Sequence, residues 1–499
     1  MKKWNAIIGI LTGIAILAGS FTGCGTPESN AQNIKNSQAT ESVAEETKST
    51  EDTKSTVETA EKTAMSTATM EKLAKSSYEG ELTIMHDSTT EEAQAYGAAE
   101  GLRTAIKNWE QSNPKITLNQ TVLANDDYKT QIATQAAAGD LPDIFLLQGM
   151  NTKTWAQQGL ILDLTSYVQE SPFYQAYNKA YFTPFTYSGK IYGLPALTGT
   201  TCTVLVYDKA AWKKAGFEQF PSTWEEVKKA DEYFKQNGYK ETIAFGNKDQ
   251  WQANSCFLST IGDRFTGAEW FQSLIDGSGA KFSDKEFVDA LTFTQDIFKS
   301  GIFNDDFNSI TNEEAREYYI SGSVPAFIGG DWDINYLQSV LKETNKELYE
   351  NTGFAVLPQP NGASKSENSL NIGLGYSLAI NSKLKENPDK LAAALNFIHY
   401  ATGPDYANYV GTNYALQGLT KVEDIDLSKF DSYVKQYYKY TYVDTKPCEI
   451  YDSYISSAVW DVLNKNMQSM LNGDATPQDV AQKTQKTYED DYLNSQRKG

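Results

Sequence analysis

Short apolar segments alternate along this chain with amphipathic segments of helical period. Segments 82–85, 116–122 and 144–147 are typical of buried strands. The segment between the first two carries one apolar helical face, formed by Ala95, Ala98, Leu102, Ile106 and Trp109. Further strands are predicted at 204–207, 242–245, 324–328, 354–357 and 377–380. This alternation predicts an α/β fold with mostly parallel sheets.

The ends of several predicted helices carry clear signals. Ser222 and Glu225 have the spacing of a capping box, in which two side chains satisfy the first free N–H groups. Asn387-Pro388 and Thr476-Pro477 predict two further helix starts, because proline fits the first helical position. Gly139 predicts the end of the helix that precedes strand 144–147.

The N-terminus is typical of a secreted protein. A basic start is followed by an apolar run at 6–17 and by small residues up to Gly23-Cys24, which predicts a signal peptide at 1–23. The run is too short to span a bilayer comfortably. Phe21-Thr22-Gly23-Cys24 resembles a bacterial lipobox, which implies a lipid (palmitate among its acyl chains) on Cys24. The alternative is an ordinary signal peptide with an incidental cysteine.

Residues 24–79 differ in composition from everything that follows. After Cys24 they are rich in Thr, Ser, Ala, Glu and Lys and nearly free of large apolar side chains. Such a segment buries too little apolar surface to offset the entropy of ordering. We predict a disordered tether that holds the folded part off a membrane, of a length that suits a Gram-positive cell wall.

Charge and rare residues exclude several classes of function. The formal net charge is −20, which argues against nucleic acid as a partner. Besides Cys24 there are only three cysteines, Cys202, Cys256 and Cys448, whose wide spacing fits three separate thiols better than a disulfide. With only two histidines and no metal motif, no metal or cofactor is expected.

The order of several motifs is similar to that of the family 1 extracellular solute-binding proteins, the maltose and oligosaccharide-binding group. The resemblance runs from Glu81 to the C-terminus and is carried by ELTIMH, YKTQIATQAAAGDLPDIFLL, WAQQGLILDLT, PSTWEEV, SGSVPAFIGGDW, GLGYSLAI and NPDKLAAALNFIHYATG. It implies a two-lobed type II periplasmic-binding-protein fold with the ligand cleft between the lobes. Lobe 1 is then 80–198 plus 376–445, and lobe 2 is 199–375 plus 446–499.

Sugars need aromatic rings for their C–H faces and carboxylates or amides for their hydroxyls. The resemblance implies a stacking ring at Trp332, after a strand and two glycines, and another at Trp251. Asp331, Asp249 and Tyr376 are further candidates beside the same cleft. Asp331 has helix capping as its alternative role, and Asp143 and Asp208, two family hallmarks, are interpreted as structural.

The remaining candidates come from strand ends, crossovers and one helix. His86 and Asp87 follow the first strand, Gln148 follows strand 144–147, and Thr200 lies at the first crossover with Thr201. His86 has a purely structural role as its alternative. Trp460 corresponds to a stacking position in some relatives, but its helical spacing with apolar neighbours favours core packing.

Three functions fit these features of the sequence. The resemblance favours a non-enzymatic binder that captures a sugar by lobe closure and passes it to the membrane permease of an ABC importer. It would act as a lipid-anchored monomer on the extracellular face of the membrane. A secreted glycosidase also uses aromatic rings and paired carboxylates. A surface sensor subunit, or a lipoprotein that binds another protein, is the third possibility.

Overall fold

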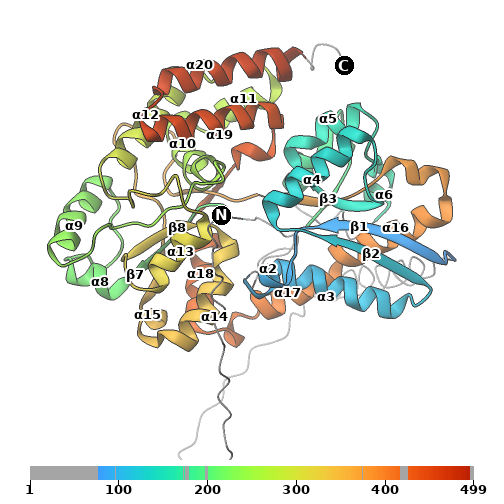
Figure 1. Cartoon of the computed structure of the whole chain (residues 1–499), viewed down its shortest axis with the longest axis horizontal. Coiled ribbons are helices and arrows are strands. Elements are labelled where there is room, and N and C mark those ends of the chain that lie inside the picture. The colour runs from blue at the N-terminus through green and yellow to red at the C-terminus, as the bar shows by residue number, and fades with distance from the viewer. Residues whose placement is uncertain are drawn as a thin grey trace, which may run out of the picture. The chain divides into compact units, whose positions relative to one another are not determined.

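A computed structural model describes residues 77–494, apart from 96, 172–173, 175–178, 197–200, 374 and 416–424 (Figure 1). The predicted signal segment, Cys24, nearly all of the predicted tether and Thr200 lie outside the described residues. Within the part of the chain that is described, no helix is both long and apolar enough to cross a membrane.

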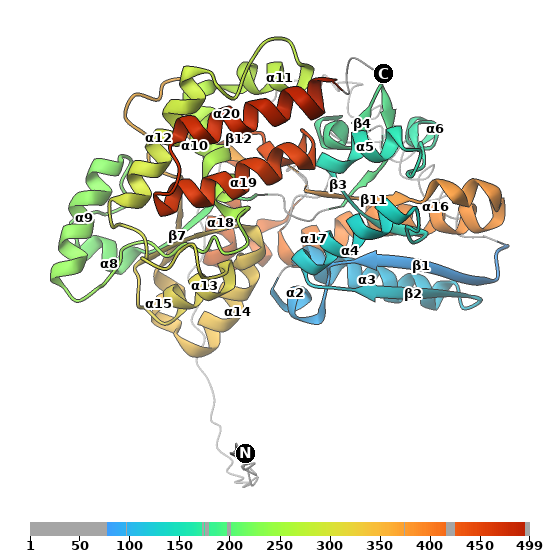
Figure 2. The same ribbon diagram turned by 45° about the horizontal axis from the view of Figure 1, so that its top comes forward.

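The first lobe is built on a five-stranded sheet in the order β2-β1-β3-β11-β6. Strands β2, β1 and β3 are parallel, whereas β11 runs antiparallel to both β3 and β6. Figure 2 shows that β11, from late in the sequence, lies beside β3. The strands are β1 (Gly80–His86), β2 (Ile116–Val122), β3 (Ile144–Gln148), β6 (Leu194–Pro195) and β11 (Tyr376–Ile380).

Helices from both ends of the lobe's sequence pack on this sheet and share one apolar core. Trp109 is buried in that core, and its Nε1 donates to Asn396 Oδ1 at 2.6 Å, which joins α3 to α16. Asp143 is structural, because its Oδ2 accepts from Thr83 N and pairs with Lys390 Nζ, each at 2.8 Å. The helices are α2 (Thr90–Ala95), α3 (Gly97–Ser112), α4 (Asn125–Ala138), α5 (Thr152–Gln157), α6 (Thr165–Glu170), α16 (Pro388–Thr402) and α17 (Pro404–Tyr414).

The second lobe has a three-stranded sheet in the order β8-β7-β9, and both of its pairings are antiparallel. The prediction of mostly parallel sheets is therefore wrong for this lobe. Alternation of strands and helices reveals their order but not the direction in which the chain returns to the sheet. The strands are β7 (Val204–Asp208), β8 (Ala326–Gly329) and β9 (Thr352–Ala355). Two-stranded sheets are formed by β4 (Thr186–Tyr187) with β5 (Lys190–Ile191) and by β10 (Ser369–Asn371) with β12 (Lys446–Cys448).

The predicted strand at 242–245 forms only isolated bridges, from Ile243 to Phe303 and from Ala244 to Phe327. At Phe245, the side chain of Asn304 takes the place of a neighbouring strand. Its Oδ1 accepts from Phe245 N at 2.8 Å and its Nδ2 donates to Phe245 O at 3.1 Å. The segment is buried as predicted. Its residues 242–244 bond to the backbone of 302, 326 and 328, and only Phe245 is satisfied by a side-chain amide.

The second lobe contains most of the remaining helices. Figure 2 shows α19 and α20 side by side, as their contacts require. The helices are α8 (Lys209–Lys214), α9 (Trp224–Gln236), α10 (Ser259–Thr266), α11 (Ala268–Asp276), α12 (Lys285–Lys299), α13 (Asn312–Ile320), α14 (Ile334–Thr344), α15 (Lys346–Asn351), α18 (Ser432–Tyr442), α19 (Ser457–Asn472) and α20 (Pro477–Thr487).

The predicted helix starts are confirmed with one shift. Asn387 and Thr476 cap α16 and α20 through their side chains. For α9 the cap is Thr223 and not Ser222, and its partner is Glu226. Thr223 has extended backbone angles, so helical geometry begins only at the next residue and the whole pattern moves by one position.

Helix α18 packs on the sheet of the second lobe, although the predicted boundary at 445 assigned it to the first lobe. The ring of Phe354, on β9, lies 5.1 Å from that of Tyr433 and 5.3 Å from that of Tyr437. Tyr440 OH also donates to Thr203 O at 3.0 Å. The tyrosines that face one side of this helix therefore tie 432–442 to the second sheet.

Cys202, Cys256 and Cys448 are buried free thiols, as the wide spacing predicts. The second lobe is consequently held together by its core and its buried polar contacts. Asp208 caps α8, where its Oδ1 accepts from Ala210 N at 2.9 Å, which agrees with its interpretation as structural.

Candidate functional site

A chamber of about 390 Å³ lies between the lobes. On the first lobe it is bordered by the carboxyl ends of β1, β2 and β3, where α/β proteins commonly bind ligands. On the second lobe it is bordered by the end of β8 and the segment before β7. Six of the predicted site residues line this chamber: Asp87, Gln148, Asp249, Trp251, Trp332 and Tyr376.

Two tryptophans form the aromatic wall of the chamber. The rings of Trp251 and Trp332 meet edge to face, with centroids 5.4 Å apart and planes at 67°. Lys129, on α4 of the first lobe, places its Nζ 4.9 Å from the centre of the Trp251 ring. Gln250, just before Trp251, has a φ of 72°. Residues other than glycine rarely adopt this backbone conformation, and those that do are often found at functional sites.

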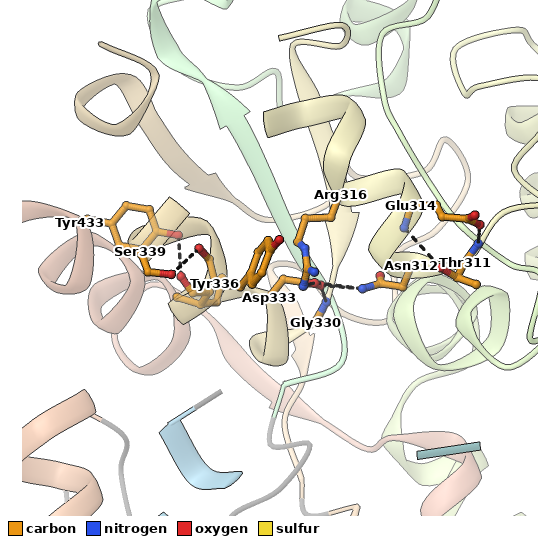
Figure 3. A network of polar contacts seen from close by, with 10 residues as sticks. Thr311, Asn312, Glu314, Arg316, Gly330, Asp333, Tyr336, Ser339 and Tyr433 are labelled. Carbon is orange, nitrogen blue, oxygen red and sulfur yellow. Dashed lines mark hydrogen bonds and ion pairs between the residues drawn. The ribbon is translucent and has the colours of Figure 1, made fainter. Parts of the chain in front are cut away.

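The loop that presents Trp332 is held by the buried carboxylate of Asp333. This carboxylate accepts from Gly330 N at 3.1 Å, from Asn312 Nδ2 at 2.9 Å and from Arg316 Nη1 at 2.9 Å. Figure 3 shows Asp333 between Arg316 and Asn312, next to Gly330. Complete burial raises the pKa of Asp333 to about 6, and the Arg316 charge opposes that rise.

Gly330 is required at this place by the Trp332 ring itself. A Cβ on Gly330 would lie only 2.3 Å from that ring, closer than real atoms approach. The missing Cβ of Gly330 therefore leaves the space in which the indole lies against the backbone of its own loop. Trp332 packs against side chains of both lobe cores.

The polar wall of the first lobe is arranged by Asn125, at the start of α4. Its Nδ2 donates to Asp87 Oδ2 and to Tyr376 OH, both at 3.0 Å. Burial raises the pKa of Asp87, and the Asn125 hydrogen bond opposes this. Gln148 lies directly opposite Tyr376 in the antiparallel register of β3 and β11. Two predicted site residues more than 200 positions apart are thus strand neighbours.

The polar wall of the second lobe holds two carboxylates that each accept from a nearby side chain. Asp249 Oδ2 accepts from Gln252 Nε2 at 3.3 Å, and Asp452 Oδ2 accepts from the Ser255 hydroxyl. Burial raises the pKa of both Asp249 and Asp452. Carboxylates and amides beside indole rings provide hydrogen-bond acceptors and an apolar surface together.

Three predicted residues lie outside the chamber, and Thr200 is not among the described residues. His86 is fully buried: its Nδ1 accepts from Ser88 N and its Nε2 donates to Gln120 Oε1, both at 3.2 Å. Asp331 exchanges two hydrogen bonds with Thr201, at 2.9 and 3.2 Å. Trp460 is 1% exposed in the second core and stacks on Tyr451, with 6.3 Å between ring centres.

Several lining residues escaped the sequence reasoning: Asn125, Asp126, Asp127, Lys129, Gln252, Ser255, Glu313 and Asp452. The first four form a polar helix start directly after a strand, at the same sheet edge as Asp87. That pattern is a usable signal, but the motif named above begins at Tyr128 and so includes only Lys129 of the four. Asp452 follows strand β12, and its sequence neighbourhood carries no comparable signal.

The described residues contain no group of three His, Cys, Asp or Glu side chains able to hold a metal ion.

Residues 86–408 match the family described as bacterial extracellular solute-binding protein. The chain belongs to this family. A binding protein of Brucella abortus (strain 2308) is 23% identical over 285 residues, which are 57% of this chain and 66% of that relative.

Solved structures similar to this solute-binding protein share its two-lobed fold. A chitin oligosaccharide binding protein superposes with a TM-score of 0.71 at 22% identity, covering 83% of this chain and 98% of the other. A protein from a study of xylan utilisation by Caldanaerobius polysaccharolyticus gives 0.68 at 24%, covering 81% and 99%. A maltose/maltodextrin-binding domain of Bdellovibrio bacteriovorus, bound to maltotriose, gives 0.64 at 19%, covering 83% and 100%.

Proposed function

We propose that this protein is the substrate-binding subunit of an ABC importer and captures an oligosaccharide in the chamber between its lobes. The observation that carries the proposal is the Trp251–Trp332 pair, which lies in a chamber lined by both lobes beside carboxylates and amides. Indole rings suit the C–H faces of sugars, and carboxylates and amides suit their hydroxyls. The bound sugar would then be delivered to the membrane permease after the lobes close by a hinge motion.

We propose that six side chains contact the ligand directly: Asp87, Gln148, Asp249, Trp251, Trp332 and Tyr376. His86, Asp331 and Trp460 are not retained, because their side chains are buried against protein atoms outside the chamber. Thr200 stays a prediction. Trp251 Nε1 supports a hydroxyl-bearing ligand, since this buried donor has no hydrogen-bond partner among the described residues. A buried donor left unpaired is costly, and a sugar hydroxyl would satisfy it.

The ligands of similar proteins support the same class of solute. The names of three of them mention chitin oligosaccharide, maltose and maltotriose. Two of them are named as a binding protein or a binding domain, and we propose no chemical step for this chain either. The glycosidase alternative differs in one observable, because an enzyme would shorten the sugar that it holds.

Calorimetry and thermal unfolding with a panel of di- to tetrasaccharides test this function. A ligand that binds only the folded state raises the Tm by mass action, by an amount that grows with its concentration. We expect at least one oligosaccharide to do so and to be recovered intact after incubation. Binding of peptides or amino acids with no response to any sugar would refute the proposed solute, and released monosaccharide would favour the glycosidase.

We further propose that the protein works as a monomer on the extracellular face of the membrane, held by a lipid on Cys24. The lipobox-like sequence and the family, which is extracellular, support this location. A Cys24→Ser form should lose its lipid and appear in the culture medium. Retention of that form in the membrane fraction, at the level of the unaltered protein, would contradict the anchor.

A further inference from the structure

The chamber is far more acidic than the chain as a whole. Six carboxyl side chains line it, whereas Lys129 is its one basic lining residue among those described. The whole sequence has 64 acidic and 44 basic side chains, so the ratio of acidic to basic side chains is much higher in the chamber than in the chain as a whole. The six are Asp87, Asp126, Asp127, Asp249, Glu313 and Asp452.

Little positive charge compensates these carboxylates. Lys129 Nζ pairs with Asp126 Oδ1 at 3.1 Å, and no other ion pair involves the six within the described part of the chain. Asp126 belongs to the first lobe and Asp249 to the second, so like charges face each other across the chamber. Burial raises the pKa of Asp249, and repulsion from Asp126 raises it further. A positive group between the lobes would relieve this repulsion.

A buried acceptor at the chamber wall points to a donor on the ligand. Gln252 is 2% exposed and lines the chamber, and its Nε2 is already used by Asp249. Its Oε1 has no hydrogen-bond partner among the described residues. An unpaired buried acceptor is costly, so a ligand N–H or O–H at this place would be favoured. The Gln252 acceptor and the carboxylates therefore both favour a ligand group that donates hydrogen bonds.

We infer that the chamber selects its sugar by charge, favouring an oligosaccharide with a protonated amino group, such as glucosamine, and rejecting uronate sugars. This inference rests on the proposed capture of an oligosaccharide and adds the chemical class. An ammonium group supplies donors and a positive charge together, and inside a protein a charge pair at contact distance gains several times what it gains in water. A uronate would add another negative charge next to six carboxyl groups.

Matched trimers test the inference by calorimetry. Glucose, glucosamine and glucuronate trimers are compared in β-1,4-linked and in α-1,4-linked series, so that linkage and charge are separated. In the series that binds, we expect the glucosamine trimer to bind about tenfold tighter than the glucose trimer or better, and the glucuronate trimer not to bind. Added salt should weaken binding of the cationic trimer more than that of the neutral one.

Variants assign the preference to the chamber. Asp452→Asn and Asp249→Asn should each reduce the advantage of the cationic trimer, whereas Lys129→Gln should increase it. Asp474→Asn, at an exposed position after α19, changes the net charge equally outside the chamber and should leave the preference unaltered. Equal affinities for neutral and cationic trimers, or tighter binding of uronate, would overturn this inference alone. No binding of any trimer would overturn it together with the proposed oligosaccharide function.

Discussion

At the scale of single residues, the site depends on how an indole is held. Trp332 emerges from a loop whose backbone is tied to the buried Asp333, and Gly330 leaves the space that the ring occupies. The sequence predicted Trp332 through its position after a strand and two glycines. It could not reveal the Asp333–Arg316 pair behind it, because Arg316 comes from a different helix.

Trp332→Ala should weaken oligosaccharide binding by about 2 kcal/mol, or roughly thirtyfold in Kd. The reason is the loss of the ring surface that stacks on the sugar. Calorimetry with the best sugar of the panel measures the loss. Trp332→Phe, which keeps a smaller ring, should lose less. An unchanged Kd for a folded Trp332→Ala protein would remove this residue from the ligand contacts.

His399 predicts a pH dependence of stability. Its ring is buried on α16 and packs edge-on to Tyr174, with ring centres 5.4 Å apart. Burial lowers the pKa of His399 to about 4, against 6.5 for an exposed histidine. The unfolded chain therefore binds more protons between these values. Stability from the neutral ring is complete above pH 6.5 and is lost as the pH falls towards 4.

Between pH 7 and pH 5, His399→Phe should consequently lose less stability than the unaltered protein, by roughly 2 kcal/mol. Urea unfolding at both pH values measures the difference. His86, whose pKa burial also lowers to about 4, remains in the variant, so part of the pH dependence should persist. Identical losses in both proteins would show that His399 is not the titrating group.

At the scale of elements, helix α4 contributes side chains to the chamber at its start and has a glycine cap at its other end. Its first two turns carry Asn125 and Lys129 to the chamber, and its far end is closed by Gly139 with a φ of 66°. Gly139 N donates to Ala136 O and Asp140 N to Gln135 O, a pattern that requires the left-handed conformation. The C-terminal end of this helix could be predicted from local sequence, because this cap depends on neighbours a few residues away.

Gly139→Ala should destabilise the protein by about 1 kcal/mol, because a Cβ disfavours the left-handed conformation. The position itself is spacious, with no atom within 4 Å of an added Cβ, so the cost comes from the backbone. Gly139→Asn should cost less, since asparagine tolerates this conformation. Urea unfolding measures both variants.

Ligand affinity should stay unchanged in Gly139→Ala, because the helix separates this residue from the chamber by roughly 20 Å. A loss of affinity equal to the loss of stability would contradict the separation of cap and site.

Segment 242–245 is the opposite case among the elements, because local sequence did not predict its pairing. Its apolar pattern correctly predicted burial, but its isolated bridges to Phe303 and Phe327 and the Asn304 bonds to Phe245 depend on residues about 60 to 80 positions away.

At the scale of the whole molecule, the two lobes meet next to the chamber. Gly149, directly after β3, approaches Ser453 of the second lobe so closely that a Cβ would lie 2.2 Å from the Ser453 carbonyl oxygen. Only glycine allows this approach of two backbones. Met150, next to Gly149, and Ser453 itself line the chamber. The distance between the lobes at this contact therefore also affects the size of the chamber.

Gly149→Ala should therefore hinder closure and weaken sugar binding by about 1–3 kcal/mol, the usual cost of overpacking. Calorimetry gives the affinity, and small-angle scattering should show less compaction on adding sugar than in the unaltered protein. A lowered Tm with full affinity and full compaction would show that the contact serves stability alone.

The sequence by itself determined the α/β class, most strands and helix caps, the family resemblance and six residues of the chamber. The class, the strands and the caps follow from short-range patterns, whereas the chamber residues came from strand ends and from the resemblance to the family. The tertiary structure decided the antiparallel sheet of the second lobe, the place of α18, the burial of His86, Asp331 and Trp460, and the acidic surroundings of the two indoles. Each of these depends on which distant segments pack together, and packing in three dimensions leaves no periodic trace along a single chain.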